Sequence, residues 1–178
     1  MTLEAATAAD VERIVALVES AFRGDASRAG WTTEADLLDG RRTGPDEIAA
    51  ILANPAQCIL LEREPDGRLL ASVVLRRDGE AAWLGMLSVR PTAQGGGTGR
   101  RVVAGAEDWV RRHWGSRRMR MTVIVQRTEL IAWYERRGYR ATGETAPFYY
   151  GDPRFGLPKR NDLSFIVLEK PLDAPAPG

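Results

Sequence analysis

A chain of 178 residues with a formal net charge of +1 fits one domain that can bury a core without disulfides or metals. The near-neutral charge argues against a nucleic-acid partner, and the lack of an apolar run of about 18 residues argues against a membrane span. One cysteine and one histidine, Cys58 and His113, are too few for a Cys/His metal site. The N-terminus lacks a signal-peptide pattern, so we expect a cytoplasmic protein without a metal.

The first third of the chain has mainly helical patterns. We expect an edge strand over residues 2–6 and an amphipathic helix over 8–22, where apolar residues recur at helical spacing. A glycine-flanked break over 24–30 precedes a short helix over 32–38, capped by Thr32 or Thr33. A further helix begins at Pro45, which suits a first turn, and ends near residue 53.

The middle of the chain is strand-like and then alternates with helices. Strands over 58–63, 69–76 and 81–89, joined by tight turns, predict an antiparallel meander. Residues 99–114 and 129–137 predict helices, and residues 119–125, 139–145 and 163–169 predict strands. A helix between the strands at 81–89 and 119–125 allows those two strands to lie parallel. We therefore expect one mixed α/β domain over residues 1–172 and a disordered tail over 173–178.

A glycine-rich loop, Gln94-Gly95-Gly96-Gly97-Thr98-Gly99, lies between a predicted strand and a predicted helix. Free N–H groups in the first helical turn and the helix dipole make such a junction a cradle for pyrophosphate, with Arg100 adding a full charge. The spacing does not match the dinucleotide fingerprint GxGxxG, and no lysine is near for a Walker loop. A loop that binds nothing remains the alternative at this point.

The loop resembles the signature of the GNAT acyltransferase superfamily, Gln/Arg-x-x-Gly-x-Gly/Ala, through Gln94, Gly97 and Gly99. The run from Ile131 to Tyr139, which contains Tyr134, is similar to a later motif of the same superfamily. The resemblance implies the GNAT fold: a central mixed sheet of six to seven strands, flanked by helices, with a splayed parallel strand pair. One position departs, because Arg127 stands where the superfamily often has an asparagine that contacts the pantetheine arm, and this leaves a side-chain role there in doubt.

The resemblance also implies that acetyl-CoA is the co-substrate. Backbone groups of the bulged strand would bind its pantetheine arm, and the glycine loop would bind its pyrophosphate. The cofactor-binding residues so implied are Leu87, Ser88, Val89, Gln94, Gly95, Gly96, Gly97, Thr98, Gly99 and Arg100. Tyr134 is the candidate catalytic residue, because a phenol with a pKa near 10 can protonate a departing thiolate. Packing of Tyr134 in the core is the structural alternative.

The acceptor half of the site is less defined. Trp31 and Glu34 lie in one segment that forms an acceptor wall in the superfamily, and Tyr149 lies in a long loop over residues 148–156 that often forms the other. Arginines in both segments would fit an acceptor that carries a carboxylate. Glu34, Asp36 and Glu80 are candidate bases, but the sequence favours a solvated surface carboxylate for each of them, and water could relay the proton instead, so no base is assigned.

The sequence thus predicts an N-acetyltransferase acting on a primary amine of a small molecule, by direct attack in a ternary complex. The alternatives are an acetyltransferase of protein or peptide amines and a non-catalytic acyl-CoA-binding sensory module. An exposed strand edge would be compatible with a homodimer, although no sequence feature requires one.

Overall fold

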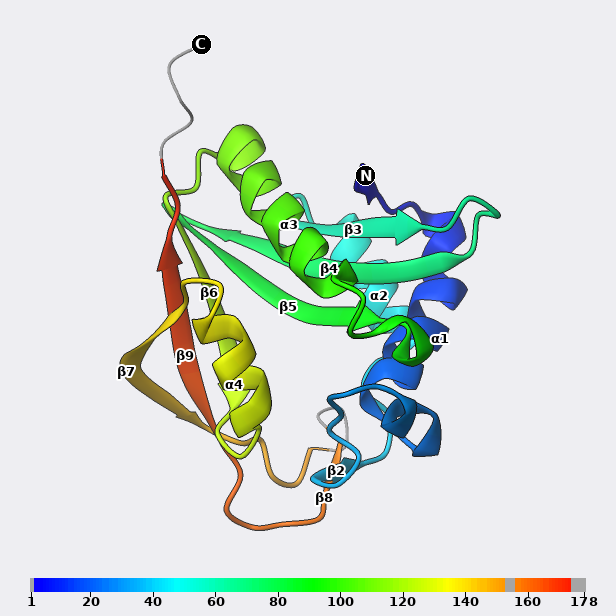
Figure 1. Cartoon of the computed structure of the whole chain (residues 1–178), viewed down its shortest axis with the longest axis vertical. Helices are drawn as coiled ribbons and strands as arrows, with labels where there is room; N and C mark the ends of the chain where they lie inside the picture. The colour runs from blue at the N-terminus through cyan, green and yellow to red at the C-terminus, as the bar shows by residue number, and fades with distance from the viewer. Residues whose placement is uncertain (1, 153–155, 174–178) are drawn as a thin grey trace.

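The computed structural model describes residues 2–152 and 156–173 and is built on one seven-stranded sheet (Figure 1). The strands lie in the order β1-β3-β4-β5-β6-β9-β7, and only the β5–β6 pair is parallel. Their bounds are β1 Glu4–Ala5, β3 Gln57–Arg63, β4 Leu69–Asp78, β5 Ala81–Val89, β6 Arg118–Ile124, β9 Ser164–Pro171 and β7 Arg140–Pro147. The mixed α/β fold, the sheet and its parallel pair are thus as the sequence predicted.

Helices cover both faces of the sheet. The bounds are α1 Val11–Phe22, α2 Pro45–Ala53, α3 Thr98–Trp114 and α4 Thr128–Glu135. The helices α1 and α2 pack on one face through residues such as Ile14 and Ile48, whereas α3 packs on the other through Val102 and Val110 (Figure 1). Short 3₁₀ helices span Ala8–Asp10, Asp25–Ala29 and Pro91–Ala93. No helix in the described ranges is long and apolar enough to cross a membrane.

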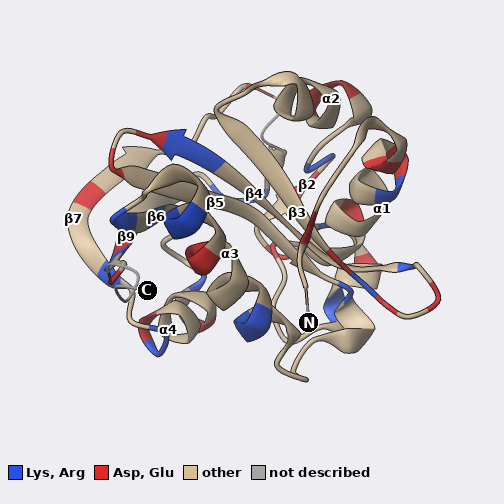
Figure 2. Ribbon diagram, turned by 90° about the horizontal axis from the view of Figure 1, so that it is seen from above, with Lys and Arg blue, Asp and Glu red and all other residues tan. Residues whose placement is uncertain are grey.

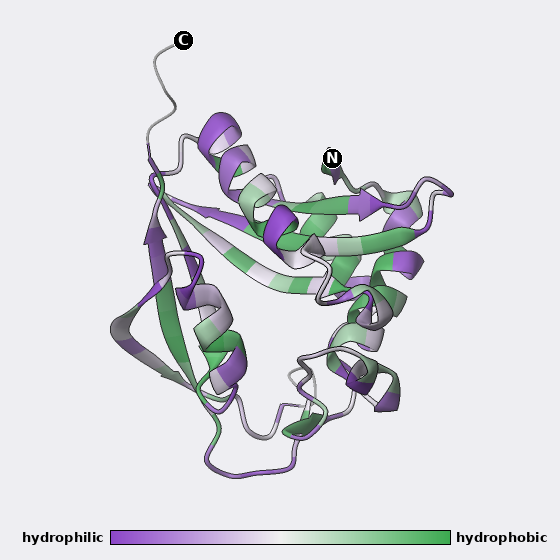
Figure 3. Ribbon diagram, viewed as in Figure 1, coloured by the Kyte–Doolittle hydropathy of each residue, from purple (hydrophilic) through white to green (hydrophobic). Residues whose placement is uncertain are grey.

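The apolar pattern of the sequence explains this layering. The inner strands β4 and β5 are largely hydrophobic along their length, and the helices turn hydrophilic stripes outward (Figure 3). Charged residues gather on the outer surfaces of the helices and at loops rather than within the sheet core (Figure 2). Both sheet faces are therefore buried, as expected for a sheet with a parallel pair.

The predicted helix over residues 32–38 is wrong. This segment makes turns and ends in a two-residue strand, β2 Leu38–Asp39, which pairs with β8 Leu157–Pro158. Thr33 Oγ1 accepts from the N–H of Ala35 at 3.0 Å, and the carbonyl of Leu37 accepts from the N–H of Lys159 at 2.9 Å. The N–H groups of Leu37 and Leu38 still donate to the carbonyl of Glu34, as in a single turn, whereas the other two backbone groups are satisfied by a side chain and by a segment far along the chain. Of the expected tail at 173–178, residues 174–178 lie outside the described ranges.

Candidate functional site

The strand β5 carries an irregularity in the middle of the sheet. Met86 has a φ of 46°, which makes it the only non-glycine residue with positive φ in the described part of the chain. Ser72 of β4 lies opposite Ser88, but Val74 lies opposite Gly85, so one residue of β4 faces two residues of β5. This is a β-bulge, which bends the strand and redirects its backbone groups.

The parallel strands β5 and β6 separate just before this bulge. Their pairing covers only Ala81–Trp83 with Arg118–Arg120, and beyond these residues the two strands diverge (Figure 1). The other edge of β6 stays paired with β9 as far as Ile124. From Leu84 to Val89, the edge of β5 that faces β6 therefore has no strand partner in the sheet, so its peptide groups are available to a ligand.

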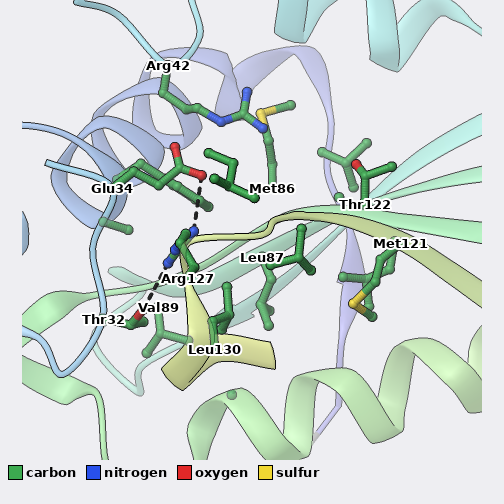
Figure 4. Close-up of a pocket in the computed structure, with 18 of the residues that line it drawn as sticks. Thr32, Glu34, Arg42, Met86, Leu87, Val89, Met121, Thr122, Arg127 and Leu130 are labelled. Atoms are coloured by element: carbon green, nitrogen blue, oxygen red, sulfur yellow. Dashed lines mark hydrogen bonds and ion pairs between the residues drawn. The ribbon is translucent and has the colours of Figure 1, made fainter. Parts of the chain in front are cut away.

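A cavity of about 980 Å³ occupies the gap between the diverging strands. Leu87 and Val89 line it from β5, and Met121 and Thr122 line it from β6 (Figure 4). Its walls include residues of α1 and α2 on one face of the sheet and of α3 and α4 on the other. The cavity thus passes through the plane of the sheet.

The glycine turn lies at one end of this cavity, at the start of α3. None of the backbone N–H groups from Gly95 to Arg100 donates a hydrogen bond to a described residue. Gly97 takes a φ of +84° as the residue before the helix, which favours glycine. A Cβ on Gly99 would lie 3.2 Å from Trp133 Cζ2, so this glycine permits the close approach of α3 to α4. Free N–H groups at a helix N-terminus form an anion site.

Most of the predicted cofactor-binding residues meet at this end. Those that line the cavity are Leu87, Val89, Gln94, Gly95, Gly96, Gly97, Gly99 and Arg100. Ser88 and Thr98 do not line it: Ser88 Oγ donates to the carbonyl of Met86 at 3.0 Å, and Thr98 Oγ1 accepts from Arg101 at 3.1 Å. Gln94 Nε2 donates to the carbonyl of Val89 at 3.1 Å, which ties the turn to the end of β5.

Tyr134 lies in α4 and lines the same cavity. Its side chain is buried, with edge contacts to the rings of Trp133 at 5.0 Å and Tyr139 at 5.6 Å between centroids. Its hydroxyl makes no hydrogen bond with a described residue, in contrast to Tyr139, whose hydroxyl donates to Glu107 at 2.9 Å. Burial raises the pKa of Tyr134 to about 12, against the smaller opposing effects of Arg127 and Arg137, so the phenol keeps its proton at neutral pH.

The three predicted acceptor-side residues, Trp31, Glu34 and Tyr149, also line the cavity. The ring of Trp31 is exposed and tilted against that of Trp133, with 6.1 Å between the centroids. Tyr149 is likewise exposed. The fold therefore brings residues from two distant segments to one cavity, although the loop that holds Tyr149 includes residues 153–155, outside the described ranges.

Glu34 is buried and fully engaged by arginines. Arg23 Nη1 pairs with its Oε2, and Arg127 Nη1 donates to its Oε1 at 3.0 Å (Figure 4). Burial alone would raise the pKa of Glu34, but the positive charges of Arg127, Arg42 and Arg23 outweigh burial and hold this pKa below its ordinary value. A carboxylate held in its charged form accepts a proton poorly, so Glu34 is unsuited to act as a base.

Arg127 and Arg42 also contribute to the site: the sequence assigned Arg127 no role, whereas Arg42 lies in the segment expected to form an acceptor wall, whose arginines would fit a carboxylate. Arg127 Nη2 also donates to Thr32 Oγ1 at 2.8 Å, so its side chain crosses from the turn before α4 to the opposite wall (Figure 4). The departure from the asparagine of the superfamily was the signal that this position differs, but nothing in the sequence indicated its partners. Arg42 lines the cavity, with its guanidinium 5.3 Å from the centroid of the Phe22 ring.

Other reactive side chains lie apart from this site. Cys58 is half-buried on β3, does not line the cavity, and has a pKa raised by burial to about 11, which keeps it a thiol. Among the residues that the structure describes, no group of three histidine, cysteine, aspartate or glutamate side chains could hold a metal ion. The chemistry available in the cavity thus includes that of backbone amides, the phenols of Tyr134 and Tyr149, and several guanidinium groups.

Comparison with known proteins agrees with this geometry. The model of the acetyltransferase (GNAT) family matches residues 12–139, and no curated protein matched the sequence. Similar solved structures include the ribosomal-protein-S18-alanine N-acetyltransferase from Escherichia coli, with a TM-score of 0.71 and 15% identity over 98% of this chain and 96% of that one. The spermidine N-acetyltransferase from Vibrio cholerae in complex with CoA and spermine has a TM-score of 0.68 and 16% identity over 96% and 95%. Nourseothricin acetyltransferase has a TM-score of 0.57 and 20% identity over 67% of each chain. At these identities the structures share the fold.

Proposed function

Because this chain belongs to the GNAT family of acetyltransferases, we propose that it transfers an acetyl group from acetyl-CoA to a primary amine of a small molecule, by direct attack in a ternary complex. We assign this activity to a single domain over residues 1–172. The observation that carries the proposal is the cavity in the β5–β6 gap, which brings the free N–H groups of the glycine turn and the phenol of Tyr134 to one space.

The described residues fit acetyl-CoA at one end of the cavity. The free N–H groups from Gly95 to Arg100 would hold the pyrophosphate, and Arg100 would add a charge-assisted contact. The unpaired edge of β5 near Leu87 and Val89 would receive the amides of the pantetheine arm. Arg137, which also lines the cavity and stacks on Trp133 at 3.7 Å, adds positive charge near this end.

In the reaction, acetyl-CoA supplies the acetyl group as a thioester. The amine nitrogen forms a bond to the carbonyl carbon as the carbon–sulfur bond breaks. Backbone N–H groups at the β5 bulge, near Leu87 and Val89, would stabilise the negative charge on the carbonyl oxygen. Tyr134 would donate its proton to the departing thiolate, and its burial keeps that proton in place until the step.

The proposal includes no side-chain base. Glu34 is the buried carboxylate nearest to the acceptor side, but its two oxygens already accept from Arg23 and Arg127. We assign the removal of the amine proton to water in the cavity, which relays it to solvent. A neutral amine then needs only positioning and a stabilised oxyanion to react.

Thiol release from acetyl-CoA, measured with free amines, peptides and intact proteins as acceptors, tests this proposal. We expect acceptor-dependent release of thiol with small amines and a mass increase of one acetyl group in the product. Activity confined to peptides or proteins would instead favour an enzyme that modifies protein amines. Calorimetric binding of acetyl-CoA without thiol release over a broad acceptor panel would favour a sensory module.

A further inference from the structure

The guanidinium of Arg42 differs from its neighbours at the acceptor end of the cavity. This end is lined by Phe22, Arg23, Glu34, Arg42 and Ile51. The side chain of Arg42 donates no hydrogen bond to a described residue, although it lines the cavity. Arg23 and Arg127, by contrast, are both bound to Glu34. Figure 4 shows Arg42 extending over the cavity on the side of Met86, with Glu34 and Arg127 on the side of Thr32. The planar donor fork of Arg42 is thus available to a ligand.

The charges around Arg42 leave it short of a partner. Three arginines lie close enough to Glu34 to interact with its charge. Glu34 pairs directly with Arg23 and Arg127 but not with Arg42. Glu47 faces Arg42 from α2 but is exposed at the rim of the cavity, and Glu19 of α1 accepts hydrogen bonds from the backbone N–H groups of Arg42 and Thr43. Burial and the like charge of Arg23 lower the pKa of Arg42 despite the opposing effects of these carboxylates. A second anion beside Arg42 would relieve this imbalance.

Apart from Asn54, Gln57 and the rim residue Glu47, the remaining walls of the acceptor end are apolar. They are formed by Phe22, Leu38, Ile51, Val74 and Met86. A charged group bound by Arg42 in such surroundings is partly removed from water, which strengthens the interaction with a planar oxyanion. Arginine binds a carboxylate through two parallel hydrogen bonds, which also fixes the orientation of the bound molecule.

We infer that the acceptor is a primary amine that also carries a carboxylate and an apolar body, as in an amino acid, and that Arg42 binds the carboxylate. This inference rests on the proposed function. The carboxylate would orient the acceptor, so that its amine points through the β5–β6 gap toward the thioester. Arg42 is therefore a substrate-binding residue that determines specificity.

An acceptor that carries extra positive charge would find no equally good site at this end. A polyamine, such as that bound by the Vibrio cholerae relative, requires carboxylates that are free to accept from ammonium groups. The buried carboxylate here, Glu34, already accepts from two guanidinium groups, and the exposed Glu47 alone would offer one screened contact. The three arginines would repel a cationic acceptor.

The charge of the unknown product tests this inference. A protein-free metabolite extract is incubated with the enzyme and labelled acetyl-CoA, and the labelled products are separated by anion exchange at neutral pH. Acetylation removes the amine charge, so an acceptor with a carboxylate gives an anionic product, a simple amine gives a neutral one and a polyamine gives a cationic one. Anionic products are expected, and neutral or cationic products would overturn the inference while leaving the proposed function intact. Absence of any labelled product would contradict both.

Matched acceptor pairs and two neighbouring arginines then test the role of Arg42. We expect kcat/KM for phenylalanine to be at least tenfold higher than for phenethylamine, which lacks the carboxylate. The phosphonate analogue, 2-phenyl-1-aminoethylphosphonate, tests whether another oxyanion can replace the carboxylate. The variant R42Q should abolish this preference through KM. The control R41Q changes an exposed side chain outside the cavity and should retain the preference.

A binding measurement separates this role from a general loss of structure. Calorimetry should show unchanged affinity of R42Q for acetyl-CoA and at least tenfold weaker binding of the carboxylate acceptor to the CoA-loaded enzyme. The conservative variant R42K, which keeps the charge but loses the planar fork, should recover part of the loss. Equal effects of R42Q and R41Q on acceptor binding would refute the assignment.

Discussion

The guanidinium of Arg127 donates a 3.0 Å hydrogen bond to the carboxylate of Glu34, across a separation of 93 positions in the chain. Arg23 binds the other oxygen of the same carboxylate. The pairing links the turn before α4 to the segment before β2, and both segments line the acceptor end of the cavity. One buried carboxylate therefore offsets part of the charge of two buried guanidinium groups and joins the two segments of the acceptor wall.

Replacing Glu34 with glutamine should strongly destabilise the fold, because two buried guanidinium groups would lose their counter-charge. We expect E34Q to lower the free energy of unfolding by about 3–5 kcal/mol, as measured by urea denaturation. The control D36N removes an exposed carboxylate that pairs with Arg28 at 2.6 Å, and its effect should stay below about 1 kcal/mol. A loss in E34Q no larger than that in D36N would show that Glu34 does not hold the arginines together.

Replacing Tyr134 with phenylalanine should remove the proton donor for the thiolate. We expect Y134F to lower kcat by about 10²-fold or more, because a positioned general acid contributes on this scale, while the Kd of acetyl-CoA changes little. The control Y139F removes a hydroxyl that donates to Glu107 outside the cavity. It should reduce stability by about 1.5–3 kcal/mol, as for a hydrogen bond to a charged group, and keep kcat. Steady-state kinetics and calorimetry measure both quantities, and an unchanged kcat in Y134F would remove the assignment.

The raised pKa of Tyr134 predicts how stability depends on alkaline pH. Its pKa is about 12 in the folded protein and 10.0 in its ordinary state, so above pH 10.0 the unfolded chain loses this proton before the folded chain does. Its contribution to stability is complete below pH 10.0 and declines toward pH 12, at about 1.4 kcal/mol per pH unit. Urea denaturation over this range should therefore show a shallower decline for Y134F. The decline that remains would include Tyr139, whose pKa is raised by burial and by Glu107.

Alanine variants of the glycines at the two ends of α3 should distinguish an effect on acetyl-CoA binding from an effect on stability. Gly97 and Gly115 both have positive φ, at +84° and +65°, so alanine at either position should cost about 1–2 kcal/mol of stability. Only Gly97 lies at the cavity, and G97A should also weaken acetyl-CoA binding severalfold because the turn must shift. Calorimetry on both variants measures this difference. Equal affinities in the two variants would indicate that the N-terminal end of α3 does not hold the pyrophosphate.

The sequence predicted the elements whose patterns are local. The strand β5 has its predicted bounds, and the parallel β5–β6 pair followed from the helix between the two strands. The segment 32–38 was misread because its threonines and acidic residues favour a helix locally, whereas β8, more than 100 residues later, determines its structure. A strand of two residues has no periodicity from which it could be predicted.

The parts of the site that lie in continuous sequence motifs could be predicted, whereas the contacts between distant segments could not. The glycine turn and Tyr134 lie in continuous motifs, and both reach the cavity. The engagement of Glu34 by Arg23 and Arg127 depends on contacts between segments far apart in the chain, which a single sequence does not reveal. Ser88 and Thr98, predicted by their places in the motif, turn their side chains to other partners.

Because the cavity crosses the sheet, the coenzyme and the acceptor would approach from opposite faces and meet only at the β5–β6 gap. A single bisubstrate compound, with the sulfur of the coenzyme joined through a short linker to an amino acid, would then thread the sheet and occupy both ends at once. Such a compound should bind far more tightly than either half, since joining the halves saves the entropy of fixing a second molecule. The sheet itself would act as the partition between two independent entrances, which makes each entrance a separate target for inhibitor design.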